Sequence, residues 1–262
     1  MTQATEVLLP ASPDEASEQF GDGDDVTVIG GGTIVVPELT HGRLVPKKAL
    51  LLSRAGLDTL AHQGDTVTIG AGLPVHRLAE LADDAQALAE CALNVADYEV
   101  RRQGTVGGNV CAQPGPDAPR GDLQGPLLAL DAVARSTGAG GERSEPLEDF
   151  LASRDGRLLL DLSFERPAAS AFAALRYPHT HAYTVLAVSG VRTTSGETRL
   201  AATGVAEHGV RLHRAEGAVD DRGVAALADV ELADDALASA WYRERALPVL
   251  VRRVLATLEE AA

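Results

Sequence analysis

The chain has 262 residues, of which 45% are hydrophobic and 23% are charged, a composition typical of a globular protein with a core and not of a disordered or fibrous chain. Its 38 acidic and 23 basic side chains give a formal net charge of -15, which repels phosphate backbones and anionic lipids. Nucleic acid and membrane surfaces are therefore disfavoured as partners. The length predicts roughly one to two domains of ~100–200 residues each.

Two cysteines, Cys91 and Cys111, are too few for a disulfide framework and too few for an iron–sulfur cluster, which normally takes four thiolates. Any such cluster has to lie on another chain. No apolar run approaches the ~18–20 residues of a membrane span. The first basic residue is Arg43 and no continuous apolar run follows the N-terminus, so a cytoplasmic location is expected.

Two β-branched runs, residues 26–29 and 66–69, predict strands, and each is followed by a glycine cluster that predicts a tight turn. Two prolines and a glycine between these runs exclude one long helix over residues 33–48. Residues 49–52 are apolar and predict the next strand.

The middle of the chain alternates between helical and loop patterns. Residues 78–93 place apolar side chains at helical spacing and predict one amphipathic helix. The stretch 104–125 is rich in Gly, Pro, Asn and Gln and predicts a long structured loop, after which residues 127–132 form a short helix or a buried strand. A glycine-rich turn follows at 137–144, and residues 158–164 have a strand pattern.

Proline and small residues at 165–171 predict a linker. Beyond it, turn signals separate three strands of an expected antiparallel meander, residues 183–191, 198–203 and 210–213. Two helices are expected to close the chain, the last from about 234 to 258 with a kink or split at Pro248. This order of elements predicts an α+β architecture in two unequal parts.

Glycine gathers in three loops, at Gly30–Gly32, at Gly70 and Gly72, and at Gly104, Gly107 and Gly108. A Rossmann site needs G-x-G-x-x-G, and the first two loops do not fit because Val35 and Val75 occupy the sixth position. Three separate glycine loops would instead let main-chain amides approach a diphosphate from several sides without side-chain obstruction. The alternative is that each cluster is an ordinary turn.

Other candidate sites are weaker. His179 and His181 lie two residues apart on a predicted strand, but no third ligand lies near them in the sequence, so no metal site is expected. Arg101 is a candidate source of positive charge near the glycine loops, with a surface arginine as the alternative. Cys111 is expected to be a small buried side chain and not a nucleophile. No catalytic residue is expected.

Four stretches carry a family resemblance: residues 28–33 (VIGGGT), 69–71 (IGA), 100–109 (VRRQGTVGGN) and 114–117 (PGPD). Together they resemble the FAD-binding (medium) subunit of the molybdenum hydroxylases, of carbon monoxide dehydrogenase and xanthine dehydrogenase type. GTVGGN with its downstream aspartate is the most specific element, and the resemblance extends from about Pro10 to Leu258. It implies a PCMH-type FAD-binding fold of two α/β subdomains, 1–54 and 55–167, followed by a C-terminal domain with an antiparallel sheet and helices, 168–262.

The resemblance also implies the cofactor-binding residues. Two loops would surround the FAD pyrophosphate, one formed by Ile29, Gly30, Gly31, Gly32, Thr33 and Ile34, the other by Thr105, Val106, Gly107, Gly108 and Asn109. Asp117 would bind the flavin nucleotide, and Tyr183 would cover one face of the isoalloxazine. The chain departs from the family pattern at Ile34, Arg102 and Leu73, which puts the flavin affinity in question.

The function implied by the resemblance is that of an FAD-containing oxidoreductase subunit of a heterotrimeric molybdenum hydroxylase. A large molybdopterin subunit would oxidise the substrate, and electrons would pass from the 2Fe-2S clusters of a small subunit through this chain's FAD to a terminal acceptor. Two alternatives remain open. One is a flavin-free structural or assembly subunit of the same fold, which the three departures motivate. The other is a self-standing FAD-dependent oxidase.

Overall fold

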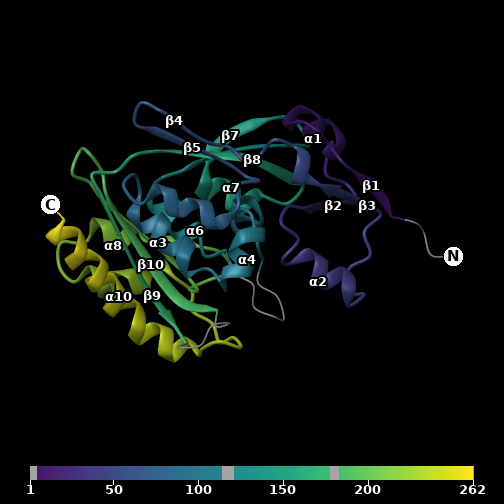
Figure 1. Cartoon of the computed structure of the whole chain (residues 1–262). Helices are drawn as coiled ribbons and strands as arrows, with labels where there is room; N and C mark the ends of the chain where they lie inside the picture. Colours follow the sequence, from purple (N-terminus) through teal and green to yellow (C-terminus); the bar gives the residue numbers. More distant parts are fainter. Residues whose placement is uncertain (1–4, 114–120, 178–182, 262) are drawn as a thin grey trace.

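The computed structural model describes residues 5–113, 121–177 and 183–261 (Figure 1). Its strands form three sheets, each drawn from one stretch of chain, residues 6–51, 60–165 and 169–211. Helices lie between and around the sheets, so the predicted α+β class is confirmed. The domain boundaries after residues 54 and 167 stay a prediction. Over the described ranges, no helix has the length and apolar character needed to cross a membrane.

The first sheet has three parallel strands in the order β1, β3, β2, which span Glu6–Leu8, Lys48–Leu51 and Val26–Ile29. Helix α1 (Pro13–Phe20) packs Phe20 into a small apolar cluster with Leu50. The helix begins after Ser12 because the serine hydroxyl accepts a hydrogen bond from the main-chain amide three residues on. A short 3-10 helix, η1 (Leu52–Arg54), follows β3.

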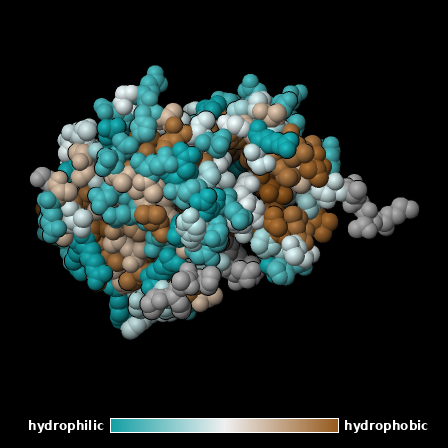
Figure 2. Space-filling view, in the orientation of Figure 1, coloured by the Kyte–Doolittle hydropathy of each residue, from teal (hydrophilic) through white to brown (hydrophobic). Residues whose placement is uncertain are grey.

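This N-terminal part has a smaller core than the rest of the molecule. Figure 2 shows hydrophobic surface over it. The large hydrophobic side chains exposed here include Val7, Leu9, Val36 and Val45. Its buried cluster is completed by leucines from a strand of the second sheet, so the position of the N-terminal part depends on that neighbour.

The second sheet is antiparallel, with five strands in the order β4, β5, β8, β6, β7, which span Leu60–Gln63, Thr66–Gly70, Arg157–Glu165, Val133–Gly138 and Arg143–Pro146. The main core of the molecule combines this sheet with the 3-10 helix η2 (Val75–Leu81) and with helices α3 (Gln86–Asn94), α6 (Gln124–Ala129) and α7 (Leu147–Ser153).

Strand β8 joins two cores. Its Leu158 and Leu160 pack in the N-terminal cluster, whereas Leu159 and Leu162 pack in the main core. Side chains alternate between the two faces of a strand, which sends neighbouring leucines to different clusters, and a register shift in the pairing of β8 with β6 lets Leu162 share a face with Leu159. Because the start of this strand borders both cores, it also reaches the space between them.

The third sheet is antiparallel, in the order β12, β11, β10, β9, spanning Val210–Arg211, Thr198–Thr203, Thr184–Arg192 and Ala169–Arg176. Every residue of β10 except Arg192 is buried, because α10 (Ala240–Glu260) packs on one face and α3 and α6 lie against the other (Figure 1). Three short helical segments lead into α10: α8 (His213–Gly217), α9 (Arg222–Ala225) and η3 (Ala226–Asp229).

Most predicted strands are confirmed to within two residues at each end. The single helix predicted over 78–93 is wrong, because the chain forms η2 and α3 with a break at residues 82–85. In the break Ala85 is buried with an extended φ of -155°. Asp84 forms a hydrogen bond with His62 at 3.0 Å and an ion pair with Arg166 at 2.7 Å. Burial and ion pairing thus override the helical period.

Three further predictions need correction. Residues 169–171 belong to β9 and not to a linker; their small side chains allow α3 to approach, and Ser170 Oγ accepts a hydrogen bond from the Ala87 amide at 3.0 Å. The last helix begins at Ala240, capped by Ser239, and continues as one helix through Pro248. The stretch 104–125, expected to be a loop, contains the short helix α5 (Val106–Val110) as well as the start of α6.

The first glycine loop packs directly on the connection between α4 (Tyr98–Gln103) and α5. A Cβ atom added at Gly31 would lie 1.8 Å from the carbonyl oxygen of Gln103, and one added at Gly30 would lie 2.6 Å from Thr105 Oγ1. Only residues without a side chain allow this approach of backbone to backbone. These glycines are therefore required by the packing of the two loops, whatever ligand they bind.

The substitution Gly31→Ala tests this packing. Its methyl group has to displace main chain, so the ligand-free protein should lose about 1–3 kcal/mol of unfolding free energy, measured by urea denaturation. Gly217→Ala is the matched control, because nothing lies within 4 Å of a Cβ at that position. A Gly31→Ala protein as stable as the control would contradict the loop contact.

Candidate functional site

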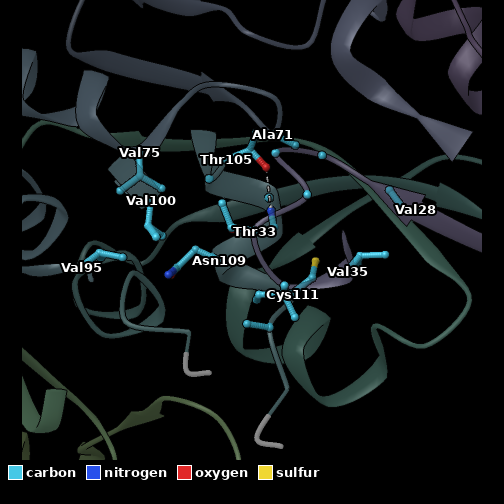
Figure 3. A pocket seen from close by; sticks show the side chains of 18 of the residues that line it. Val28, Thr33, Val35, Ala71, Val75, Val95, Val100, Thr105, Asn109 and Cys111 are labelled. Carbon is cyan, nitrogen blue, oxygen red and sulfur yellow. Dashed lines mark hydrogen bonds between the residues drawn. The ribbon is translucent and has the colours of Figure 1, made fainter. Parts of the chain in front are cut away.

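A cavity of about 580 Å³ lies where the three parts of the chain meet (Figure 3). Its walls come from the first glycine loop with the start of α2 (Val35–Thr40), from the α3–α5 region, from the start of β8 and from Tyr183 just before β10. The volume falls within the range of ~300–1,000 Å³ that is usual for ligand and cofactor pockets. The cavity is therefore the candidate functional site.

Ten of the predicted cofactor-binding residues line this cavity: Gly30, Gly31, Gly32, Thr33, Ile34, Thr105, Gly107, Gly108, Asn109 and Tyr183. Two others do not. Ile29 ends strand β2, and Val106 is fully buried in the main core. Asp117 lies outside the described residues, as do His179 and His181. The structure thus brings together two glycine loops that are about 75 residues apart in the sequence, as a shared ligand site requires.

The first glycine loop offers main-chain donors. Within the described ranges, the amides of Gly31, Gly32, Thr33 and Ile34 donate no hydrogen bond. All four residues line the cavity, and helix α2 begins directly after them. Amides without a protein acceptor beside a cavity are suited to bind an anionic oxygen.

The second glycine loop is held differently, because its amides from Val106 to Asn109 already have protein acceptors. Val106 donates to the Leu73 carbonyl at 2.8 Å, and Gly107 donates to the Ala71 carbonyl at 2.7 Å. The Gly108 amide donates to Thr105 Oγ1 at 3.2 Å, which caps α5 (Figure 3). The main chain of this loop is therefore held in place by its own hydrogen bonds. Its glycines allow close approach of neighbouring main chain and do not supply unbonded amide donors.

The side chains in the cavity form a polar centre between two apolar groups. In the view of Figure 3, Thr33 and Thr105 lie centrally. Valines and a cysteine lie on the two sides, with Val75, Val95 and Val100 on one and Val28, Val35 and Cys111 on the other. Such a cavity is complementary to a ligand with a polar middle and two flat or apolar ends.

Charged groups are few at the cavity. Among its described lining residues, Arg157 is the single cation, and it is bound to Ser136 Oγ at 3.2 Å and to the Ser136 carbonyl at 2.9 Å. Burial lowers the pKa of Arg157. Arg101, a candidate charge source, does not line the cavity and instead donates to main-chain carbonyls. Main-chain amides, not basic side chains, are thus the main donors available to an anion.

The Cys111 thiol is protonated at neutral pH, because burial raises its pKa to about 11. It therefore contributes an apolar surface to the cavity and not a thiolate nucleophile. Within the described ranges, no three His, Cys, Asp or Glu side chains come together as a metal site.

Several lining residues were not predicted from the sequence: Ala71, Val75, Val95, Ala96, Asp97, Val100 and Asp122. Asp97 had a detectable signal, because an Asp before a helix is a preferred N-cap, and its carboxylate accepts from the Val100 amide at 2.9 Å. The small apolar residues carry no such signal. Conversely, Gly70 and Gly72 of the remaining glycine cluster pack against Leu57 and do not line the cavity.

Comparison with known proteins identifies relatives that agree with the family resemblance predicted from the sequence. Residues 3–162 match the family described as the FAD binding domain in molybdopterin dehydrogenase. The chain is 26% identical over 261 residues to subunit alpha of the 6-hydroxypseudooxynicotine dehydrogenase complex of Paenarthrobacter nicotinovorans, covering 89% of this chain and 87% of that protein. It is 28% identical over 262 residues to the carbon monoxide dehydrogenase medium chain of Afipia carboxidovorans, covering 89% and 88%.

Solved structures share the fold. Carbon monoxide dehydrogenase from Hydrogenophaga pseudoflava matches with a TM-score of 0.85 and 24% identity, covering 100% of this chain and 99% of that one. Quinoline 2-oxidoreductase from Pseudomonas putida 86 matches with a TM-score of 0.81 and 22% identity, covering 100% and 98%. The family match spans more than half of the chain. The predicted resemblance is thereby confirmed, and the chain belongs to the family of FAD-binding domains in molybdopterin dehydrogenases.

Proposed function

We propose that this chain carries electrons through FAD in a complex of the molybdenum hydroxylase type. FAD would occupy the cavity, receive electrons from 2Fe-2S clusters of a small partner subunit and pass them to a terminal acceptor. A large molybdopterin subunit would oxidise the substrate. The relatives named as a dehydrogenase complex subunit and as medium chains of carbon monoxide dehydrogenase support this assembly. The observation that carries the proposal is the cavity between the two glycine loops.

The residues of the cavity fit FAD. Its diphosphate needs hydrogen-bond donors without bulky side chains, which the amides of residues 31–34 provide. The two apolar groups flanking Thr33 and Thr105 suit the ring systems at the two ends of the molecule. Tyr183 lines the cavity and is 37% exposed, and its ring would cover one face of the isoalloxazine.

When bound, FAD supplies the redox chemistry, and this chain binds it, orients it and limits its contact with water. The first glycine loop would hold the diphosphate, while the second loop fixes the distance across the cavity through its bonds to Ala71 and Leu73. The valines exclude water from the ring systems. No step of the proposal requires a side chain of this chain to transfer a proton.

The departures from the family pattern do not favour the flavin-free alternative. Of the three, only Ile34 lines the cavity. Arg102 points to Tyr98, with Nη1 donating to the phenolic oxygen at 3.0 Å. Leu73 is fully buried, and its carbonyl accepts from Val106. Two of the three departures therefore leave the cavity unchanged, and the third adds apolar surface to it.

Binding of FAD can be tested with Ile34→Asp. Titration of the ligand-free protein with FAD, followed calorimetrically, should give one FAD per chain for the wild type. A carboxylate at position 34 would repel the diphosphate and should weaken binding by about tenfold or more. Arg102→Asn, outside the cavity, is the control and should bind as the wild type does. A wild-type chain that takes up no FAD would favour the flavin-free subunit.

Alkylation of Cys111 reports on occupancy of the same cavity. Its raised pKa predicts slow reaction with iodoacetamide at pH 7–8 and a rate that climbs as the pH approaches 11. Saturating FAD should slow the reaction at least tenfold, because the ligand covers the cavity wall. Cys91, which is fully buried away from the cavity, provides the internal control. Equal rates with and without FAD would place the ligand elsewhere.

The same thiol affects stability at high pH. A thiol whose pKa is raised in the folded state stays protonated there while the unfolded chain ionises near pH 9. The stabilisation of the folded state by the protonated Cys111 thiol is complete below pH 9 and is lost as the pH rises towards 11. Cys111→Ser should therefore flatten the decrease in unfolding free energy over this window, as followed by urea denaturation at several pH values.

The electron route is tested on the native complex. A tag on this chain should co-purify a molybdopterin subunit and a 2Fe-2S subunit, detected by metal analysis and by their absorption. Substrate added without oxygen should then bleach the flavin bands after the iron–sulfur bands. Purification of a lone flavoprotein that oxidises a small molecule directly would support the self-standing oxidase instead.

A further inference from the structure

One wall of the cavity is a turn that its own sequence does not favour. The turn joins α3 to α4 through Asn94, Val95, Ala96 and Asp97, and the last three of these line the cavity. Ala96 has a φ of +44°, in the left-handed region that is unfavourable for a residue with a side chain. Such a conformation persists when surrounding contacts hold it in place.

Two arginines provide those contacts. Arg101 Nη1 donates to the carbonyl oxygens of Val95 at 2.7 Å and of Ala96 at 2.9 Å. Arg176 reaches the same turn from β9, with Nη1 donating to the Asn94 carbonyl and Nη2 to the Ala96 carbonyl, each at 2.9 Å. The three consecutive carbonyls of the turn are thus all bound by guanidinium groups. We call this arrangement the carbonyl clasp.

The carbonyl clasp also reaches the segment that carries Tyr183. Asn94 Nδ2 donates to Thr184 Oγ1 at 2.9 Å, and Thr184 pairs with Arg176 across β9 and β10. Tyr183 directly precedes Thr184 and lines the cavity. The turn and the tyrosine are therefore fastened to each other by side chains from two different parts of the fold.

Holding two cations in this place has an electrostatic cost. Burial, and next to it the charge of Arg176, lower the pKa of Arg101. The carbonyl oxygens offset part of that cost, because charge-assisted hydrogen bonds are stronger than neutral ones. In the described structure, Arg102, next to Arg101 in the sequence, donates to the Tyr98 phenolic oxygen and not to the carbonyls of the turn. Arg192 pairs with Ala169 at the opposite end of the β9–β10 pair from Arg176. The contacts are thus specific to Arg101 and Arg176.

We propose that Arg101 and Arg176 are positioning residues for the cofactor: by clasping the carbonyls of residues 94–96 they fix one cavity wall and, through Asn94 and Thr184, the place of Tyr183 against the flavin ring. This inference rests on the proposed function for the role of Tyr183, while the clasp itself is a property of the ligand-free chain. Neither arginine lines the cavity, so both act through the main chain that they hold.

Hydrogen exchange on the ligand-free protein tests the clasp without FAD. Peptides covering residues 94–98 should exchange at least tenfold faster in Arg101→Ala and Arg176→Ala than in the wild type. Arg102→Ala removes the same charge next to Arg101, and Arg192→Ala removes it at the far end of the β9–β10 pair. Both should leave this exchange unchanged. If Arg176→Ala does not fold, Arg176→Lys replaces it, and the exchange rate of residues 94–98 should rise by a smaller factor. Unchanged exchange at 94–98 in the clasp variants would overturn the proposal.

FAD binding and flavin fluorescence then test the positioning role. Arg176→Ala should raise the Kd for FAD roughly tenfold and should lose most of the fluorescence quenching that Tyr183→Leu loses. Arg176→Lys should recover part of both, whereas Arg192→Ala should match the wild type. Normal Kd and quenching in Arg176→Ala, despite faster exchange, would contradict positioning. A wild-type chain that binds no FAD would contradict the proposed function. The hydrogen-exchange experiment would still show whether the two arginines hold the turn.

Discussion

The approach of one main chain to another, without side chains between them, is the constraint on which this site depends. Gly31 lies so close to the Gln103 carbonyl that even a methyl group would overlap it, and Gly107 is held against Ala71 by its own hydrogen bond. The first contact brings the N-terminal part to the middle part, the second holds the other glycine loop in place, and the cavity lies between the two loops. The glycines therefore shape the site first as packing residues.

The two glycine loops have different roles at the cavity. The first retains amides that no described residue accepts from, whereas the amides of Val106 and Gly107 in the second are bound to Leu73 and Ala71. A site with donors on one side and a fixed platform on the other can hold a diphosphate without basic side chains, which agrees with the scarcity of cations around the cavity. Strand β8, shared by two cores, and Tyr183 complete the walls from the remaining parts of the chain.

The sequence predicted much of this and missed the rest for identifiable reasons. Local pattern was sufficient for strands such as β2 and β5, whose β-branched residues end in glycine turns, and the GTVGGN stretch identified the second loop. Composition misled at 169–171, because the small residues of β9 serve close packing with α3 and not a linker. The left-handed Ala96 depends in part on Arg176, which reaches it from a segment 80 residues away, and no local pattern encodes such a contact.

In this site the first loop would donate to the ligand, while the second loop would only support it. Amide chemical shifts of ¹⁵N-labelled protein during titration with FAD test this most directly. We expect the amide protons of Gly31, Gly32, Thr33 and Ile34 to move strongly downfield as they gain acceptors, while those of Val106 and Gly107 keep their positions. Large downfield shifts at Val106 and Gly107 with none in the first loop would contradict it.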